Sequence, residues 1–226
     1  MRAIIQQMAA LIGKDLRIES RGKDLLLTMT MFSLTLIVVF NFTFDAESAQ
    51  AYLVAPGILW AAIAFASSTG MNRTFNREQE ESCIQGLILS PIDPGTLYCA
   101  KFVSNLIFLL LCETIFLPVF WVLFDLPWRV LQPPFWLLLF FGSAGFAVVG
   151  TIFSAIAAES RAKELMLPIL MLPILVPVIL AAINGTQAIF ESGNPTNWQP
   201  WIRLLVGFDV IFFVLAFLLY PFVVGE

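Results

Sequence analysis

A dense group of residues that could do chemistry lies in one short segment, REQEESCIQGLILSP, at positions 77–91. Four of its first five residues are charged, and its second half is apolar and ends at a proline. The chain contains no His at all, and it has no G-x-x-x-x-G-K-[ST] phosphate-binding loop. The sequence therefore predicts no catalytic residues and no nucleotide site of its own.

Two further carboxylates, Glu113 and Asp209, stand inside long apolar stretches. Ionisable residues in such stretches are costly and are candidates for function by default. Counted at about 1.5 Å of rise per residue, the two lie at nearly the same depth in a hydrocarbon core of about 30 Å. They could line one cavity, with at least one of them protonated, or each could bond a nearby Ser, Thr or Asn.

Three cysteines, Cys83, Cys99 and Cys112, show neither a CxxC pattern nor a Cys/His spacing. We interpret them as small buried hydrophobic residues. The sequence therefore predicts no metal site and no disulfide framework.

The elements that carry these residues follow from composition, since 59% of the 226 residues are hydrophobic and only 12% are charged. A bilayer-spanning helix needs about 20 predominantly apolar residues. Six stretches qualify, at 25–44, 52–70, 97–124, 135–158, 165–183 and 201–224. The predicted fold class is an all-α integral membrane protein with six transmembrane helices in a single domain, 1–226. No cleavable signal peptide is expected, because no small-residue cleavage pattern follows the first 24 residues.

Lys and Arg are distributed unequally between the two sides of these spans. Ten lie in the segments 1–24, 70–101 and 158–164, whereas only Arg129 and Arg203 lie on the other side. Because cytoplasmic loops carry the excess of Lys and Arg, both termini are predicted to face the cytoplasm.

The first 24 residues have apolar side chains at a helical spacing, at positions 4, 5, 8, 11, 12 and 16, with Lys14, Arg17 and Arg21 mostly on other faces. This pattern is typical of a helix that lies in the membrane interface with its cations toward lipid phosphates. The alternative is a simple positive anchor before the first span.

The segment 71–96 is the other sizeable piece outside the spans. We expect a helix that begins near Asn76, carries its acids in the first turns, and places Ile84, Leu87 and Ile88 on one face. Pro91 and the following Asp-Pro-Gly are expected to end it. Either the apolar face rests on lipid, or a cytoplasmic partner grips the helix and its movement is transmitted to the neighbouring spans.

Two of the later spans have special compositions. The fourth span has small residues near one face, which predicts close helix packing: Ser143, Ala147, Gly150 or Thr151, Ser154 and Ala158. The fifth span carries Pro168, Pro173 and Pro177, which predict a kinked or broken helix beside a dimer axis or a partner, and candidate hinges. Residues 184–198 are expected to form an outer loop after it.

The order of these elements resembles the permease subunits of type-2 ABC exporters, whose cytoplasmic helix has the pattern R-E-x-E-x-G-[ST]-L-x-x-L-x-x-[ST]-P. This chain departs from the pattern at Ser82 and Ile84. Three blocks, VAPGILWAAIAFAS (54–67), IQGLILSPIDPGTLYCAK (84–101) and LMLPILMLPILVPVIL (165–180), further resemble the haem exporter permease B family of the cytochrome c maturation (Ccm) system.

The resemblance implies a bacterial inner-membrane subunit that pairs with a second copy of itself and with two copies of a cytoplasmic ATPase, which binds ATP and Mg. It also implies a haem-handling membrane subunit and a haem chaperone as partners, with haem handled by those partners. No cofactor is expected on this chain, and no nucleic acid. The residues expected to couple to the ATPase are Arg77, Glu78, Glu80, Glu81, Ile84, Leu87, Ile88 and Pro91.

Other functions stay open on the residues alone. One is a type-2 ABC permease for a lipid, a polysaccharide or a drug, and another is a non-transporting scaffold of an assembly complex. An integral membrane enzyme is disfavoured, because no His/Asp/Glu cluster faces one compartment.

Overall fold

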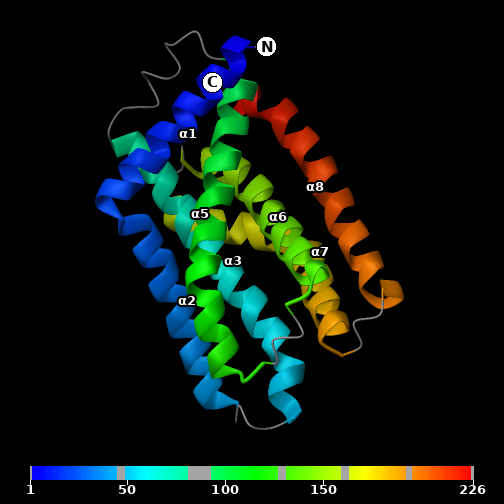
Figure 1. Cartoon of the computed structure of the whole chain (residues 1–226). Coiled ribbons are helices and arrows are strands. Elements are labelled where there is room, and N and C mark those ends of the chain that lie inside the picture. The colour runs from blue at the N-terminus through cyan, green and yellow to red at the C-terminus, as the bar shows by residue number, and fades with distance from the viewer. Residues whose placement is uncertain are drawn as a thin grey trace.

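The structure, a computed structural model, describes residues 2–44, 49–80, 93–126, 131–158, 163–191 and 195–224. The described residues form helices and no strands (Figure 1). The helices are α1 (Arg2–Gly22), α2 (Asp24–Thr43), α3 (Ala49–Glu80), α5 (Pro94–Leu123), α6 (Pro133–Ala158), α7 (Lys163–Glu191) and α8 (Pro195–Val224).

Six of these helices contain segments that are long and apolar enough to cross a membrane. The segments are Asp24–Thr43, Leu53–Met71, Pro94–Leu123, Pro133–Ala157, Leu167–Glu191 and Thr196–Val223. The predicted all-α membrane fold is therefore confirmed. Figure 1 shows the N- and C-termini at the same end of the bundle, as an even number of spans requires.

The outer loop predicted at 184–198 is wrong, because α7 continues to Glu191 and α8 already begins at Pro195. Asn184 and Gly185, the first two residues of that predicted loop, both lie inside α7. A Cβ at Gly185 would come within 2.2 Å of a Leu138 methyl carbon and 3.1 Å of the Trp201 Cβ. This glycine therefore serves a close helix contact, and Asn184 donates back to the Leu180 carbonyl at 2.7 Å.

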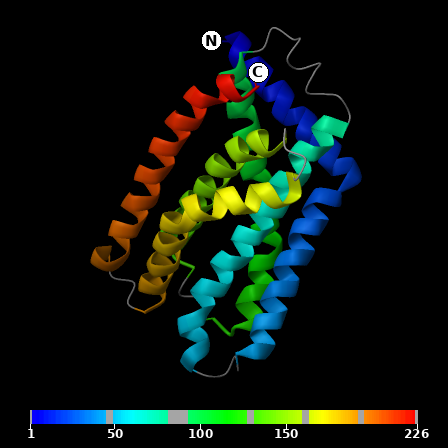
Figure 2. The same ribbon diagram turned by 180° about the vertical axis from the view of Figure 1, so that it is seen from behind.

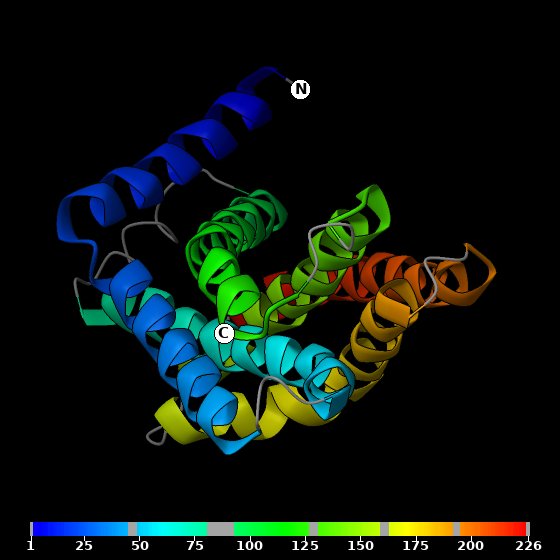
Figure 3. The same cartoon turned by 60° about the horizontal axis from the view of Figure 1, so that its bottom comes forward.

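α1 makes a sharp corner with α2 at the end of the bundle that holds both termini (Figures 1 and 3). The linking residue, Lys23, has a left-handed backbone with φ of 57°. Leu11 of α1 is buried in a small cluster with residues from the start of α5 and the ends of α6 and α8, while Ile4 and Ile5 are exposed. The apolar residues of α1 are thus divided between the bundle and its surroundings.

α6 occupies the centre of the bundle and contacts α3, α5, α7 and α8. Of the small residues predicted as a packing face, Ser143, Ala147, Gly150, Thr151 and Ser154 are buried. Trp60 of α3 lies over Gly142, where a Cβ would come within 2.2 Å of the indole ring. Its Nε1 donates to Thr186 of α7 at 2.9 Å, so three helices meet at this point.

Candidate functional site: buried polar contacts and the ends of α3 and α5

The segment predicted to couple to a partner lies between two long helices of the bundle. α3 continues to Glu80 without a break, so Arg77, Glu78 and Glu80 belong to its last turn. The helix start predicted near Asn76 is therefore wrong, since no proline interrupts the chain there and helix can propagate from the span. Glu81, Ile84, Leu87, Ile88 and Pro91 lie outside the described residues.

The Asp-Pro-Gly motif at 93–95 begins a helix, although it was expected only to end one. The Asp93 carboxylate accepts from the Thr96 backbone N–H at 3.1 Å, and Pro94 takes the first helical position. An Asp cap followed by proline suits a helix start, because proline has no N–H to leave unpaired in the first turn. α5 therefore starts abruptly, directly after residues 81–92.

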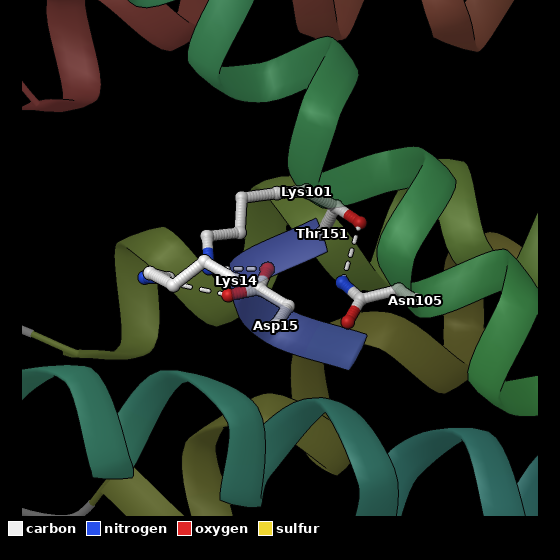
Figure 4. A network of polar contacts seen from close by, with 5 residues as sticks. All are labelled: Lys14, Asp15, Lys101, Asn105 and Thr151. Carbon is white, nitrogen blue, oxygen red and sulfur yellow. Dashed lines mark hydrogen bonds and ion pairs between the residues drawn. The ribbon is translucent and has the colours of Figure 1, made fainter. Parts of the chain in front are cut away.

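A chain of polar side chains connects α1, α5 and α6 near this point (Figure 4). Lys101 Nζ of α5 lies 2.9 Å from Asp15 Oδ2 of α1, and Lys14 Nζ lies 3.3 Å from the other oxygen of Asp15. One turn further along α5, Asn105 Nδ2 donates to Thr151 Oγ1 of α6 at 2.9 Å. Lys101, Asp15, Asn105 and Thr151 are all buried.

A second acid of α1, Glu19, is also buried and bonded. Its Oε1 accepts from the backbone N–H of Leu26 in the first turn of α2 at 2.8 Å. A carboxylate suits the N-terminus of a helix, where backbone N–H groups have no partner within the helix. Asp15 and Glu19 were not predicted as site residues, although Leu11, Asp15 and Glu19 follow one another at four-residue intervals, which places all three on one helix face.

Glu113 lies fully inside the bundle, on α5. The hydroxyl of Ser143 on α6 donates to its Oε1, whereas Oε2 has no hydrogen-bond partner among the described residues. A bond to a nearby Ser, Thr or Asn is one of the two arrangements predicted for this carboxyl. The bond leaves Glu113 facing protein and not lipid.

Asp209 of α8 approaches α6 from another side. A Cβ at Gly145 would lie 3.0 Å from its Oδ1 and 3.2 Å from the Val178 methyl carbons. Neither oxygen of Asp209 has a hydrogen-bond partner among the described residues, and the residue is only 9% exposed. Asp209 is therefore buried, and none of the described residues supplies the Ser, Thr or Asn partner that was predicted as one alternative for it.

The depths predicted for Glu113 and Asp209 agree with their contacts on α6, at Ser143 and Gly145. Two residues of helix correspond to a rise of about 3 Å and a rotation of about 200°. The two carboxyls therefore meet α6 at similar heights but from opposite sides. Because α6 lies between them, these contacts favour separate surroundings for the two carboxyls over the alternative in which they line one cavity.

The three prolines lie within α7, which runs as one helix from Lys163 to Glu191 but is strongly bent. Figure 2 shows its yellow N-terminal part crossing the bundle and its gold C-terminal part running along it. Pro173 and Pro177 are exposed, together with Ile169, Val176 and Leu180. The fifth span is therefore half on the surface of this chain, and an interior position would need a neighbouring chain or subunit. That Pro168, Pro173 or Pro177 acts as a hinge stays a prediction.

Among the described residues, no group of three or more His, Cys, Asp or Glu side chains could hold a metal ion. Cys99 and Cys112 carry free thiols, and Cys112 Sγ accepts from Thr30 Oγ1 at 3.6 Å. Cys83 lies outside the described residues.

The fold and these sites define a polytopic α-helical membrane protein with buried polar contacts between its helices and no recognisable catalytic cluster in the described residues. The family described as CcmB protein matches residues 6–225, which is nearly the whole sequence. The chain belongs to this family.

Named relatives extend the comparison. The chain is 24% identical to Heme exporter protein B of Pseudomonas aeruginosa, over 95% of this chain and 93% of that protein. It is 28% identical to Heme exporter protein B of Bradyrhizobium diazoefficiens, over 92% of this chain and 93% of that protein. The protein of the same name from Rhodobacter capsulatus is 27% identical over 76% and 79% of the two chains.

Proposed function

We propose that this chain is the permease subunit of an ATP-driven complex that serves haem export in cytochrome c maturation. The observation that carries the proposal is the family match over residues 6–225, together with relatives named Heme exporter protein B that align over almost their full length. The chain has no phosphate-binding loop of its own, so a separate ATPase subunit binds ATP and Mg.

In this proposal residues 77–91 form the contact with the ATPase. Support comes from their place in the fold, because α3 ends at Glu80, α5 begins at Pro94, and these two helices contact each other in the bundle. A force applied to the segment therefore acts on two central helices at once. The charges of Glu78, Glu80 and Glu81 select the partner. The force is transmitted through the apolar side chains of Ile84, Leu87 and Ile88.

The complex proposed here contains two ATPase copies, a second copy of this chain, a haem-handling membrane subunit and a haem chaperone. It lies in the bacterial inner membrane with both termini of this chain in the cytoplasm. The unequal distribution of Lys and Arg supports that orientation.

Haem is handled by the partners in this proposal, and ATP hydrolysis drives release of the loaded chaperone. Haem iron in proteins is held mostly by His, Cys, Met or Tyr, and this chain has no His. Met29, Met71 and Met171 are buried among apolar side chains. We expect the purified chain to show no stoichiometric Soret absorption, and such a band would contradict this part of the proposal.

Deletion of the gene tests the function directly. We expect holo-cytochrome c to disappear and haem to accumulate on its chaperone. The gene supplied in trans should restore holo-cytochrome c and remove the accumulated haem. A permease for a lipid, a polysaccharide or a drug would leave cytochrome c unchanged. A passive scaffold would give no stimulation of ATP hydrolysis when the chain is mixed with the ATPase.

The contact itself is tested by reversing the charge of Glu78, Glu80 and Glu81 together to Lys. The ATPase should no longer co-purify, while the permease remains in the membrane. Glu191→Lys, at the exposed end of α7, is the control charge reversal and should leave co-purification intact. Unchanged co-purification of the triple variant would refute the assignment of this segment.

A further inference from the structure

A buried ion pair connects the N-terminal helix to the helix that follows the proposed ATPase contact. Lys101 Nζ and Asp15 Oδ2 are 2.9 Å apart, and the two side chains are only 3% and 7% exposed. The second cation at Asp15, Lys14, is more distant and more exposed, since its Nζ lies 3.3 Å from Asp15 Oδ1 and its side chain is 36% exposed. Figure 4 shows the carboxylate held between these two ammonium groups.

The pair lies close to the start of α5. Lys101 is seven residues after Pro94, or about 10 Å along the helix axis. One turn before Asp15, Leu11 packs in the same cluster as Leu97 and Tyr98 of α5. The first turns of α5 are therefore attached to α1 by both apolar contacts and a charge pair.

The other end of α1 is attached to α2. Glu19 accepts from the Leu26 backbone N–H at 2.8 Å, and the Lys23 backbone N–H donates to the Glu19 carbonyl at 2.7 Å. These bonds fix the corner between the two helices on both sides of the left-handed residue Lys23. α1 thus bridges the start of α5 and the start of α2.

Stability alone does not explain such a pair. The attraction between two buried charges roughly offsets the cost of removing them from water. Replacing such a pair with apolar residues of similar volume therefore often leaves the protein equally stable or more stable. A buried charge pair does fix which residues face each other, because either charge without its partner is strongly unfavourable. Its effect is to hold one relative position of two elements.

We propose that Asp15 and Lys101 are positioning residues that make α1 follow the first turns of α5 when the segment before α5 is displaced. Glu19 then transmits the displacement to the start of α2. The inference rests on the proposed function, since the displacement comes from the ATPase. It adds a second route into the bundle, beside the direct one through α3 and α5.

The test measures movement in the complex of this chain with its ATPase, reconstituted in lipid nanodiscs. With the native cysteines replaced, one spin-label pair joins Arg17 of α1 to Val210 of α8, and another joins Val103 of α5 to Val210. Arg17 and Val210 are exposed, and Val103 is partly exposed. Pulsed electron paramagnetic resonance compares the distances with ADP and with a non-hydrolysable ATP analogue.

We expect both distances to shift with the nucleotide in the parent protein. In Asp15→Leu/Lys101→Met, which replaces both charges with apolar side chains, the α5 distance still shifts and the α1 distance does not. In the complex that also contains the haem-handling subunit and the chaperone, release of the loaded chaperone per ATP hydrolysed should fall about two- to thirtyfold, the range over which side chains modulate coupling between sites. The exchanged pair Asp15→Lys/Lys101→Asp should restore the α1 shift, and Lys14→Gln should retain it.

An α1 distance that shifts equally in the apolar variant overturns the inference. So does a parent protein in which α5 moves and α1 stays in place, a result that needs no variant and therefore does not depend on whether one folds. These outcomes leave the proposed function intact. If the parent protein does not co-purify with the ATPase, or if neither spin-label distance in the parent shifts with the nucleotide, the source of displacement is removed. Either result overturns both this inference and the proposed coupling to the ATPase.

Discussion

α6 and α8 are both long apolar helices, yet they take opposite places in the bundle. In α6, 78% of the residues in the membrane-spanning stretch are buried within the chain, whereas in α8 only 17% are buried. Both were predicted as spans from the same property, their hydrophobicity. In lipid, however, hydrophobicity gives a helix no preference for the centre of the bundle, because the hydrocarbon tails are as apolar as leucine.

The difference lies in side-chain size. α6 presents Gly142, Gly145 and Gly150 to neighbouring helices, and a Cβ at any of them would meet another side chain within 3.0 Å. On α8, a Cβ at Gly207 would meet no atom of the described residues within 4 Å. Small residues let helix backbones approach closely and so gain dispersion contacts. Hydrophobicity thus predicts that a segment spans the membrane, and small residues predict which span lies at the centre.

The most damaging change to this arrangement should be Gly142→Leu. The new side chain would occupy the position of the Trp60 indole, which is fully buried and held by its hydrogen bond to Thr186. Overpacking of this kind typically costs about 1–3 kcal/mol, and the rigid ring places Gly142→Leu at the upper end or beyond. Unfolding of the purified protein by SDS in mixed micelles measures the loss.

Gly207→Leu is the matched control on α8. Because a Cβ there enters open space, we expect a change within about 0.5 kcal/mol. Equal losses for the two leucine variants would mean that α8 is packed as closely as α6, and would remove the contrast between the helices.

Asp209→Ala should stabilise the protein, although it shortens a buried side chain. Both carboxyl oxygens of Asp209 lack a hydrogen-bond partner among the described residues, and such groups cost about 1–3 kcal/mol each to bury. Glu113→Ala is the comparison across α6, and it should destabilise because Ser143 loses its acceptor. If Asp209→Ala gains stability but loses holo-cytochrome c formation, Asp209 is retained for function. A loss of stability would instead indicate a bonded Asp209.

The sequence predicted the spans and the packing face of α6 because both depend on composition and spacing along one helix. It did not predict how the helices are rotated against one another. Glu113 and Asp209 illustrate this, since their depths could be counted along the chain but the position of α6 between them could not.

The polar contacts of α1 were missed for a different reason. Charged residues near a membrane surface are expected to face water or lipid phosphate, so the sequence predicted contacts to lipid phosphates for Lys14, Arg17 and Arg21 and none for the acids between them. The acids Asp15 and Glu19 face the bundle instead, because Lys101 and the first turn of α2 supply their partners. Only the spacing of Leu11, Asp15 and Glu19 along one helix face could have indicated it.

A smaller effect should follow from Thr151→Val, which keeps the shape of a buried α6 side chain and removes its hydroxyl. The hydroxyl accepts from Asn105 at 2.9 Å and donates to the Ala147 carbonyl at 2.7 Å. Hydrogen bonds between membrane helices are worth about 0.6 kcal/mol on average and about 1.7 kcal/mol at most. We expect a loss in that range by the same SDS titration, and Asn105→Leu/Thr151→Val should recover part of it. No loss at all would show that the α5–α6 contact rests on packing alone.

The smallest effect should come from Leu218→Ala on the outer face of α8, where the side chain is 58% exposed. In the purified chain, detergent or lipid replaces the lost methyl groups, so the free energy of unfolding should change by less than about 0.5 kcal/mol. The same variant in the assembled complex is the sharper measurement. If Leu218→Ala weakens the complex but not the isolated chain, the exposed face of α8 is covered by a neighbouring subunit. The low burial of α8 would then describe one chain alone, because the assembled complex would bury its outer face as the chain itself buries α6.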